Sequence, residues 1–563
     1  MDEKIKAIIG PPGCGKTHAL GAIVEHELSE HLTPWGGRIG DGYPVYVCSL
    51  TRAAATECAE RFRGEGRHGC DTRVKRDAVG TLHSAAYRQL GAPQLVVGKK
   101  IKELEDDTGY QFSDARDDDI DDHRPDTPPD SAVDGDALLS RLDWYRHTRT
   151  PLPMDSHLAR FAEQYSRWKR ENEMLDFTDL IEHATTDTHE APNGARHLIV
   201  DEAQDLSRLE LDLLKRWALS AERLTICGDP RQALYVWRGA HPEMFADQRL
   251  ENSTEVLSQS WRVPQAVHTA AEDWARRLSS WAPQPYTPRD EKGDTGQLSG
   301  STWREPERLL DRIDDWLSNG DSVLIQASCG YMLTPMIVTL RRHGYPFANP
   351  RRRKRGDWNP LGAGGGTSMR QRSLDLTTPP PDQSWSGTQA RRWLEVMRAK
   401  GVIRRGMKSK IPSLLHDDTD IVDVINHVMD ILEPATFQHV YDMAFSGEEL
   451  TPLLLWWTSN VESAKQKTAN YIAEIVKQRG IQQLEREPKL YVGTIHSFKG
   501  FEADHVITFP DLSAAGARQW SAGGVSADEC TRLGYVAITR ARATSWTTSP
   551  VNCQQAIPLW EVL

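Results

Sequence analysis

The stretch KIKAIIGPPGCGKTHALGAIVEHELSEHL (residues 4–32) decides the fold, because it reads as a strand, a glycine loop and a helix in succession. Within it, GPPGCGKT fits the phosphate-binding pattern GxxxxGK(S/T). Glycines let backbone N–H groups wrap phosphates, Lys16 reaches the β- and γ-phosphates, and the Thr17 hydroxyl ligates Mg²⁺. The flanking strand and helix leave little room for a chance glycine turn. The sequence predicts a nucleotide site of Gly10, Pro11, Pro12, Gly13, Cys14, Gly15, Lys16, Thr17 and His18.

A second apolar strand, ARHLIVDEAQD (195–205), ends in carboxylates. Asp201 is placed to hold the water shell of Mg²⁺, and Glu202 to orient and polarise the attacking water. An acidic strand end alone is weak evidence, since most such ends are solvated loops. Combined with the phosphate loop, it predicts a hydrolytic NTPase rather than a protein that only binds nucleotide.

Short apolar strands that alternate with helical stretches predict an α/β fold with parallel sheets. Two regions of different amino-acid composition interrupt this pattern of strands and helices. An acidic, Pro- and Asp-rich stretch over 105–136 reads as a solvated loop and leads into helical patterns. A basic, glycine-rich stretch, RRRKRGDWNPLGAGGGTS (351–368), is followed mainly by helices. We therefore expect two α/β cores, each with a mainly helical insertion.

A chain of 563 residues exceeds what one hydrophobic core usually supports, so several domains are expected. Hydrophobic residues at 39% and charged residues at 26% are typical of a soluble globular protein. The expected boundaries are 1–90 and 172–253 for the first core, 91–171 for its insertion, 254–348 and 488–563 for the second core, and 349–487 for the second insertion.

The charge and cysteine content narrow the class of protein. A formal charge of −12 argues against a surface coated in basic charge, although nucleic-acid binding depends on local patches. Eight scattered cysteines without a CxxC pair predict neither a zinc site nor a disulfide framework, and favour a reducing cytoplasm. The N-terminus leaves no room for a signal peptide, and no apolar run approaches the ~20 residues of a membrane span. We expect a soluble cytoplasmic protein that does not bind a membrane.

Phosphoryl transfer also needs positive charge on the equatorial oxygens, beyond Lys16 and Mg²⁺. Two arginines are candidates: Arg262 in LSQSWRVP (257–264) and Arg540 in YVAITRARA (535–543). A lone arginine is usually a surface residue, and spacing alone leaves both readings open.

Nine segments in order resemble a superfamily 1 DNA helicase of the UvrD/Rep/PcrA type. They are GPPGCGKT (10–17), SLTRAAATECAER (49–61), GTLHSAAYRQL (80–90), LDFTDL (175–180), IVDEAQDLS (199–207), CGDPRQALYVWRGA (227–240), LSQSWRVP (257–264), VGTIHSFKGFEADHVI (492–507) and ECTRLGYVAITRARA (529–543). The resemblance implies two RecA-like cores that close on ATP in the cleft between them.

The resemblance assigns further residues to the ATP site. It implies that Gln232 contacts the γ-phosphate or the attacking water, and that Arg262 and Arg540 are arginine fingers from the second core. Trp261 stands where the family usually has Tyr, and is expected to stack on adenine. The remaining residues that it implies are Glu502, on the ribose, and Gly500, near the phosphates.

The resemblance also implies a site for nucleic acid. Aromatic stacking tolerates any base, which suits a motor that steps along a strand. Plain core packing is the alternative for the aromatic residues, and a structural role is the alternative for the histidines. The implied DNA-binding residues are Ser49, Thr51, Arg52, His83, Tyr235, Trp237, Arg238, Thr494 and His496.

One loop, GDPRQALYVWRGA (228–240), carries residues implied for the ATP site and residues implied for the DNA site. We expect it to couple the sites, with Gln232 facing the γ-phosphate and Tyr235 and Trp237 facing the bases. Whether these side chains point to opposite faces is a question for the structure.

Four features depart from the family pattern. No Gln precedes residue 89, so a glutamine that reads adenine is missing and selectivity for ATP is in doubt. Leu50 replaces a frequent aromatic, and Ala53 replaces a lysine. The chain ends soon after the last motif, so a fused nuclease is not expected. The RRRKR run (351–355) reads either as a solvated face or as a salt-sensitive contact with duplex phosphates.

The expected function is an ATP-driven, Mg²⁺-dependent DNA helicase of replication or repair, moving 3′→5′ on single-stranded DNA and separating duplex DNA. One alternative is a translocase that displaces proteins without unwinding. Another is a non-motor P-loop NTPase such as a switch or kinase, which explains the phosphate loop but neither the distant arginines nor the aromatic loop. Protein partners and the preference for DNA over RNA stay open.

Overall fold

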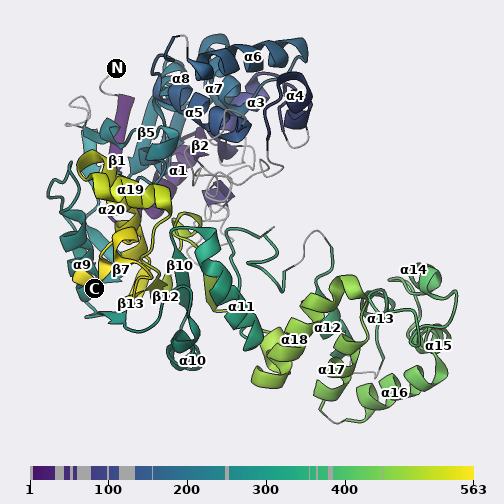
Figure 1. The fold of residues 1–563 in the computed structure, drawn as a ribbon. Helices are drawn as coiled ribbons and strands as arrows, with labels where there is room; N and C mark the ends of the chain where they lie inside the picture. The colour runs from purple at the N-terminus through teal and green to yellow at the C-terminus, as the bar shows by residue number, and fades with distance from the viewer. Residues whose placement is uncertain are drawn as a thin grey trace. The chain divides into compact units, whose positions relative to one another are not determined.

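The computed structural model describes most of the chain, which forms two compact units (Figure 1). The first unit contains Met1–Gln297, Lys499–Glu502 and Pro510–Leu563, and the second contains Leu298–Phe498 and Ala503–Phe509. The described residues are 4–31, 44–50, 55–56, 58–59, 78–97, 100–112, 134–154, 156–246, 253–353, 355–362, 366–377, 384–447 and 449–563.

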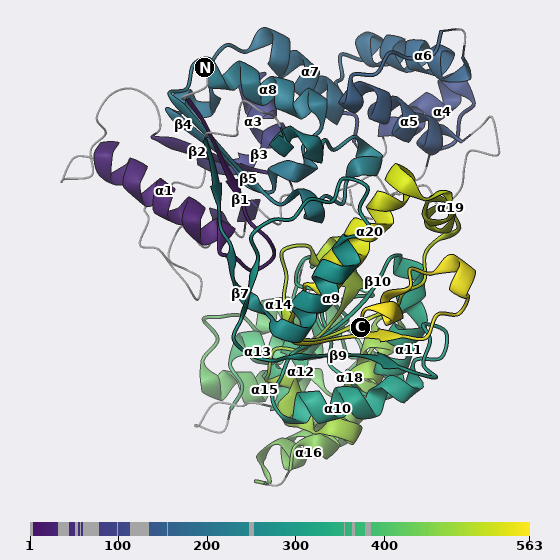
Figure 2. The ribbon, with the colours of Figure 1, turned by 90° about the vertical axis from the view of Figure 1, so that its left-hand side faces the viewer.

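A six-stranded parallel sheet forms the centre of the first unit (Figure 2). Its strand order is β3-β2-β4-β5-β1-β6. Strands β2 and β4 are buried along their whole length, which their near-continuous apolar sequences VYVCS and HLIV explain. The strands are β1 (Ile5–Ile9), β2 (Val45–Ser49), β3 (Val79–Thr81), β4 (His197–Val200), β5 (Arg223–Gly228) and β6 (Thr254–Val256).

The register of this sheet places the loops that carry the candidate site residues at one edge. Ile9 pairs with Gly228, and Val200 pairs with Ile226, so the loops after β1, β4 and β5 begin side by side. Carboxyl ends of parallel strands are where α/β proteins bind ligands. The α/β class with parallel sheets is therefore confirmed, and the loops that carry Lys16 and Asp201 start at this edge.

Helices cover the sheet and form a cluster beside it. Helices α4, α5 and α6 share a hydrophobic core of their own, which includes Leu104, Leu142 and Phe161. The helices of the first unit are α1 (Lys16–His31), α3 (Leu82–Gln89), α4 (Lys100–Thr108), α5 (Gly135–Thr148), α6 (His157–Glu171), α7 (Phe177–Asp187), α8 (Arg208–Ala218), α9 (Gln265–Ala275), α19 (Ala514–Ala522) and α20 (Gly524–Ile538). Its remaining strands are β7 (Gln259–Pro264), β8 (Thr287–Arg289), β13 (Ala541–Thr548) and all but the last residue of β9 (Asp294–Leu298).

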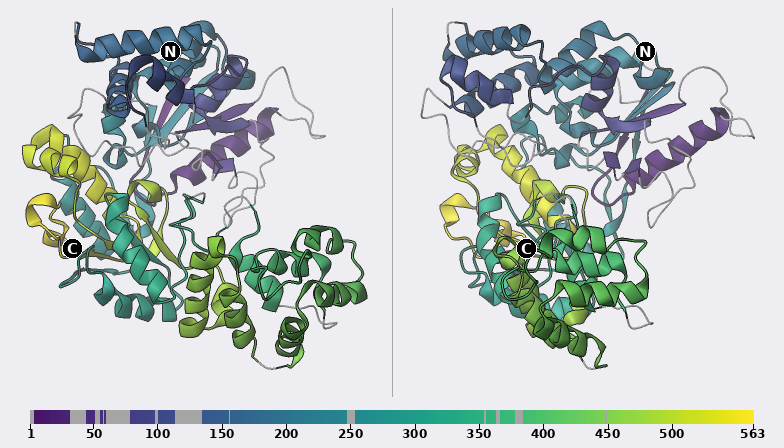
Figure 3. Two further views of the ribbon diagram at one scale, coloured as in Figure 1. Left: turned by 45° about the vertical axis from the view of Figure 1, so that its right-hand side comes forward. Right: turned by 90° about the vertical axis from the view of Figure 1, so that its right-hand side faces the viewer.

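The second unit combines parallel strands with a long helical segment, drawn in green in Figure 3. Strand β10 (Val323–Ala327) lies between β11 (Leu490–Thr494) and β12 (Ala503–Thr508), parallel to both. Helices α10 (Leu310–Ser318) and α11 (Thr334–Arg342) flank β10 in sequence. The helical segment contains α12 (Met369–Thr377), α13 (Gly387–Leu394), α14 (Ile411–Leu414), α15 (Ile421–Ile431), α16 (Pro434–Phe445), α17 (Thr451–Ser459) and α18 (Gln466–Arg479). Across the described parts of both units, no helix has the length and apolar character needed to cross a membrane.

Candidate nucleotide-hydrolysis site

The phosphate loop joins the end of β1 to the start of α1. Gly13 and Gly15 have φ of 77° and 81°, a left-handed conformation that glycine adopts without steric cost. A Cβ at Gly13 would lie 2.4 Å from the Cβ of Arg262, so the loop packs tightly against β7. The Lys16 ammonium donates to the Gly10 carbonyl at 2.7 Å. The predicted loop therefore has the backbone shape that a phosphate cradle requires.

The two predicted metal-binding residues contact each other. The Thr17 hydroxyl donates to Asp201 Oδ2 at 3.4 Å, and the Glu202 N–H donates to Oδ1 at 2.9 Å. Burial raises the pKa of Asp201, the Glu202 carboxylate raises it further, and the Lys16 ammonium opposes both. Mg²⁺ prefers oxygen donors of this kind, so Thr17 and Asp201 fit the cation.

Glu202, the predicted water-orienting residue, has an unusual backbone. Its φ of 55° is left-handed, a conformation that costs a non-glycine residue about 1–3 kcal/mol and that clusters at functional sites. Burial raises the pKa of Glu202, but the ammonium groups of Lys499 and Lys16 outweigh burial and hold the pKa below its ordinary value. The Gln204 amide also donates to this carboxylate. Glu202 is therefore ionised at neutral pH, as the orientation of a water molecule requires.

Gln232 and Arg540 lie together, although 308 positions separate them in sequence. An Arg540 guanidinium N–H donates to Gln232 Oε1 at 2.8 Å, and Gln232 Nε2 donates to Asp229 Oδ2 at 2.7 Å. Burial lowers the pKa of Arg540 to about 9, and the nearby Arg262 guanidinium contributes in the same direction. The two residues that the sequence assigned to the γ-phosphate region are thus direct partners.

Arg262 pairs with Glu502, the residue implied for the ribose. Arg262 Nε donates to Glu502 Oε2 at 2.6 Å. Burial raises the pKa of Glu502, and Arg262 outweighs burial so that the pKa falls below its ordinary value. Next to Arg262, the residue Trp261 is 73% exposed while its backbone N–H donates to the Gly13 carbonyl at 2.8 Å. Trp261 therefore offers an open ring beside the phosphate loop, as stacking on a base requires.

Sequence reasoning missed Lys499 and Asp205. The Lys499 ammonium contacts the Asp205 carboxylate, donates to the Gln232 carbonyl at 2.9 Å and lies 3.5 Å from Glu202 Oε2. Burial raises the pKa of Asp205 to about 6, although Lys499 opposes the shift. Both residues lie within the quoted motif segments, and Lys499 directly precedes Gly500, which was the only signal available. All of the residues assigned to the ATP site, with these two, belong to the first unit.

The candidate DNA-binding residues differ in their exposure. Ser49 and Tyr235 of the first unit and Thr494 of the second are buried, at 1%, 3% and 2% exposed. Burial of the Tyr235 ring favours the core-packing alternative for this residue. His496, in the second unit, is partly exposed. Thr51 and Arg52, like the Ala53 replacement, lie outside the described residues.

The loop 228–240 reaches two different environments. Its 3₁₀ turn Pro230–Gln232 faces Asp229 and Arg540, as described above. Its second turn, Val236–Arg238, contains the half-buried Trp237, and Arg238 lies 3.8 Å from the buried Glu210. Gln232 and Arg238 therefore contact separate groups, which agrees with a loop that serves two sites.

Sequence comparisons identify relatives of the segment that carries the phosphate loop, Asp201, Glu202 and Gln232. Residues 2–252 match the UvrD/REP helicase N-terminal domain. The match confirms the resemblance to UvrD/Rep/PcrA-type superfamily 1 helicases that the motifs indicate.

Individual relatives match parts of the chain. YjcD of Bacillus subtilis, provisionally named an ATP-dependent DNA helicase, is 24% identical over 260 residues, 43% of this chain and 32% of the relative. The ATP-dependent DNA helicase SRS2 of Saccharomyces cerevisiae is 25% identical over 308 residues, 47% of this chain and 25% of its own length. The ATP-dependent DNA helicase PcrA of Staphylococcus aureus is 30% identical over 143 residues, 23% of this chain and 20% of the relative. The chain thus spans a third or less of the length of these relatives.

Within the UvrD/REP-like segment, His83 lies beside an aromatic residue that sequence reasoning did not assign. The rings of His83 and Phe177 meet edge to face, with centroids 6.0 Å apart. Phe177 is 41% exposed at the first turn of α7. The signal in the sequence was an aromatic residue directly after the N-cap Asp176 in LDFTDL.

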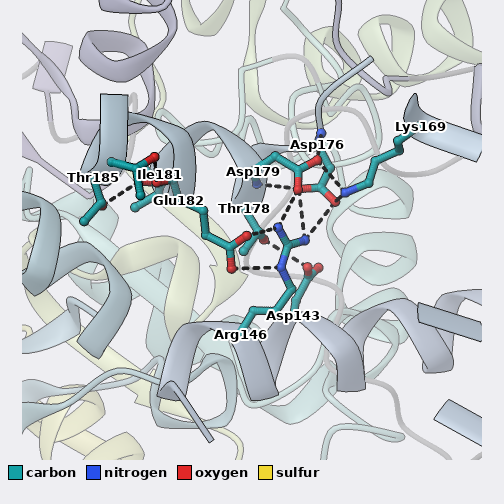
Figure 4. A network of polar contacts seen from close by, with 10 residues as sticks. Asp143, Arg146, Lys169, Asp176, Thr178, Asp179, Ile181, Glu182 and Thr185 are labelled. Atoms are coloured by element: carbon teal, nitrogen blue, oxygen red, sulfur yellow. Dashed lines mark hydrogen bonds and ion pairs between the residues drawn. The ribbon is translucent and has the colours of Figure 1, made fainter. Parts of the chain in front are cut away.

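A network of buried charges in the same UvrD/REP-like segment fixes the start of α7 (Figure 4). Arg146 of α5 donates to Asp176 Oδ2 at 3.0 Å, and Lys169 of α6 donates to the same oxygen at 2.5 Å. Asp176 and Asp179 form a capping box on α7, and Arg146 also contacts Glu182 at 2.6 Å. Burial raises the pKa of Asp176, but Arg146 and Lys169 outweigh burial and lower it. The network ties α5 and α6 to α7 and so positions Phe177.

The basic run of the second unit is partly neutralised. Arg355 lies 3.3 Å from Asp357 Oδ1, and its guanidinium stacks over the Trp358 ring at 4.0 Å from the centroid. Lys354 lies outside the described residues. Both readings of the run remain compatible with these contacts.

Proposed function

We propose that this chain is an ATP-dependent DNA helicase, which translocates 3′→5′ on single-stranded DNA and separates duplex DNA. The observation that carries the proposal is the hydrogen bond between Arg540 and Gln232, with the Glu202 carboxylate linked to Gln232 through their shared partner Lys499. This set supplies a cation for phosphate oxygens, an amide for the γ-phosphate and a carboxylate for water in one place. The printed names of the relatives support DNA as the substrate.

The proposed hydrolysis divides the work among the side chains. Glu202 accepts a hydrogen bond from the attacking water and orients it in line with the γ-phosphate. Gln232 holds the same water or a γ-oxygen, while Lys16 binds the β- and γ-phosphates. Arg262 and Arg540 stabilise charge that develops on the equatorial oxygens. Mg²⁺, held by Thr17 and Asp201, supplies charge neutralisation when it is bound.

The proposed contact with single-stranded DNA uses the second turn of the loop. Trp237 and Phe177 offer aromatic faces to bases, and Arg238 and His83 offer polar groups beside them. Because Gln232 and Trp237 share one short loop, a change at the phosphate shifts the DNA contact. We also propose that the RRRKR run binds duplex phosphates, and that residues 254–348 and 488–563 form a second RecA-like core.

A strand-displacement assay tests the proposal. Duplexes with 3′ or 5′ single-stranded tails, made of DNA or RNA, are incubated with the protein, ATP and Mg²⁺, with Glu202→Gln as the inactive control. We expect displacement of the 3′-tailed DNA duplex and ATP hydrolysis stimulated by single-stranded DNA. Stimulated hydrolysis without displacement would favour the protein-displacing translocase. Hydrolysis that ignores DNA would overturn the motor and favour a P-loop switch.

A further inference from the structure

Cys58 lies at the border between the hydrophobic core and the candidate cation site. It is 3% exposed and belongs to a core cluster with Leu20, Val47 and Ile199. Its thiol donates to Asp201 Oδ2 at 3.7 Å. A side chain that is otherwise part of the core therefore reaches the carboxylate proposed to hold Mg²⁺.

The contacts of Asp201 show what this thiol does. The Glu202 N–H fixes Oδ1 at 2.9 Å, whereas Oδ2 receives the Thr17 hydroxyl at 3.4 Å and the Cys58 thiol. Thr17 is itself a proposed ligand, so its oxygen would be engaged by the cation rather than by Asp201 if the cation were bound. Among the described residues, Cys58 would then be the side-chain donor that still restrains Oδ2 from the core side.

A thiol suits this position physically. Sulfur packs as a small hydrophobic group in the core, and its S–H is a weak donor. A weak donor orients the carboxylate while it leaves the other lone pair of Oδ2 free for a cation. A methyl group in its place would leave the core side of Oδ2 without this restraint.

We propose that Cys58 is a positioning residue, which holds the Asp201 carboxylate in the orientation that binds the divalent cation. The proposal rests on the Mg²⁺-dependent hydrolysis proposed above. It predicts that loss of the thiol weakens cation binding more than it weakens binding of nucleotide without metal.

The variants are Cys58→Ala, which removes the donor, and Cys58→Ser, which restores a donor. Cys48→Ala is the matched control, because Cys48, on β2, is also a buried thiol. Burial raises the pKa of Cys48, and the nearby charge that opposes the shift is Arg88 rather than a residue of the nucleotide site.

The direct readout is Mn²⁺ binding, measured by electron paramagnetic resonance with a non-hydrolysable ATP analogue, alongside the Mg²⁺ concentration that half-saturates hydrolysis. Thermal unfolding checks that each variant is folded. We expect Cys58→Ala to weaken Mn²⁺ binding about tenfold, the size seen when partners of metal ligands are removed. The Cys58→Ser and Cys48→Ala variants should stay within about twofold of the wild type, since each keeps a donor at Oδ2.

Three outcomes would overturn the proposal: unchanged Mn²⁺ binding in Cys58→Ala, no recovery in a folded Cys58→Ser, or an equal loss in Cys48→Ala. If the wild type binds Mn²⁺ but DNA does not stimulate hydrolysis, the proposed motor fails while the role of Cys58 is still decided by the binding assay.

Discussion

Arg540 donates a hydrogen bond to the Gln232 carboxamide at 2.8 Å, so the last motif of the chain meets the loop that follows β5. The Arg540 side chain is also anchored, because its Nε donates to the Val536 carbonyl at 3.0 Å. The guanidinium is thus held in place before any substrate contact, which reduces the reorganisation that catalysis requires.

Replacement of this guanidinium should abolish turnover. We expect Arg540→Ala to lower kcat for ATP hydrolysis by about a thousandfold or more, the usual size of an arginine-finger effect. Binding of a fluorescent ATP analogue should persist. Arg540→Lys should rescue little, since a lysine lacks the fork that reaches two acceptors. Arg518, exposed on α19, provides the control substitution. Turnover retained by Arg540→Ala would remove the residue from the mechanism.

Lys499 should determine the pH below which kcat for ATP hydrolysis falls. Burial raises the pKa of Glu202, and Lys499 is the strongest influence that lowers it. In Lys499→Met the pKa of Glu202 should therefore rise, so kcat should begin to fall at a higher pH as the solution is acidified. Lys499→Arg keeps the charge and should keep the wild-type profile. Profiles of kcat against pH that coincide for wild type and Lys499→Met would contradict this role.

Asp176→Asn should destabilise the fold through charge alone, because Asn caps a helix about as well as Asp. Removing one partner from a buried ion network costs about 3–5 kcal/mol, measured here as a fall in the free energy of unfolding in denaturant. The matched control is Asp134→Asn, at the N-cap of α5, where the Ala137 N–H donates to the carboxylate at 3.0 Å. A loss in the control as large as in Asp176→Asn would mean that capping is responsible.

The same variant should change the dependence of stability on pH. The folded pKa of Asp176 lies below its ordinary value of 3.8. Its contribution is therefore fully present above that value, and is lost as the pH falls through the lower folded pKa. The stability difference between wild type and Asp176→Asn should be constant near neutral pH and should shrink in acid. A difference that stays constant in acid would contradict the shift.

Trp237→Ala should lose most of the stimulation of hydrolysis by single-stranded DNA, and should bind a poly-dT oligonucleotide more weakly. A stacked base is worth about 1–3 kcal/mol, so the dissociation constant should rise by roughly 5- to 150-fold. Trp281, which is 37% exposed elsewhere in the first unit, is the control for loss of an exposed indole. Full strand displacement by Trp237→Ala would exclude the ring as a DNA contact.

Local chemistry made the phosphate loop predictable. The positive φ of Gly13 and Gly15 and the start of α1 at Lys16 follow from eight consecutive residues. The strand end at Asp201 was equally readable, because a parallel strand that is buried on both faces must be apolar until it leaves the sheet.

Contacts between distant residues were not predictable from spacing. Lys499 and Asp205 are 294 positions apart, and a charged residue in a loop is normally solvated, so nothing local indicated their contact. Arg262 and Arg540 were candidates from chemistry alone, but only the family resemblance assigned them to the ATP site. The resemblance implied that Tyr235 contacts DNA, but its ring is buried. A pattern of aromatic residues in the sequence does not reveal which ring is buried.

The connection between the two 3₁₀ turns of the loop 228–240 is too short and too buried to change its length. Only Ala233, Leu234 and Tyr235 separate the two turns, and three residues span at most about 10 Å when fully extended. All three residues are buried, so this connecting segment cannot bend away from the protein when one of the turns moves. Two glycines inserted after Leu234 would lengthen this segment. The variant should therefore still hydrolyse ATP and still bind single-stranded DNA, but DNA should no longer stimulate hydrolysis.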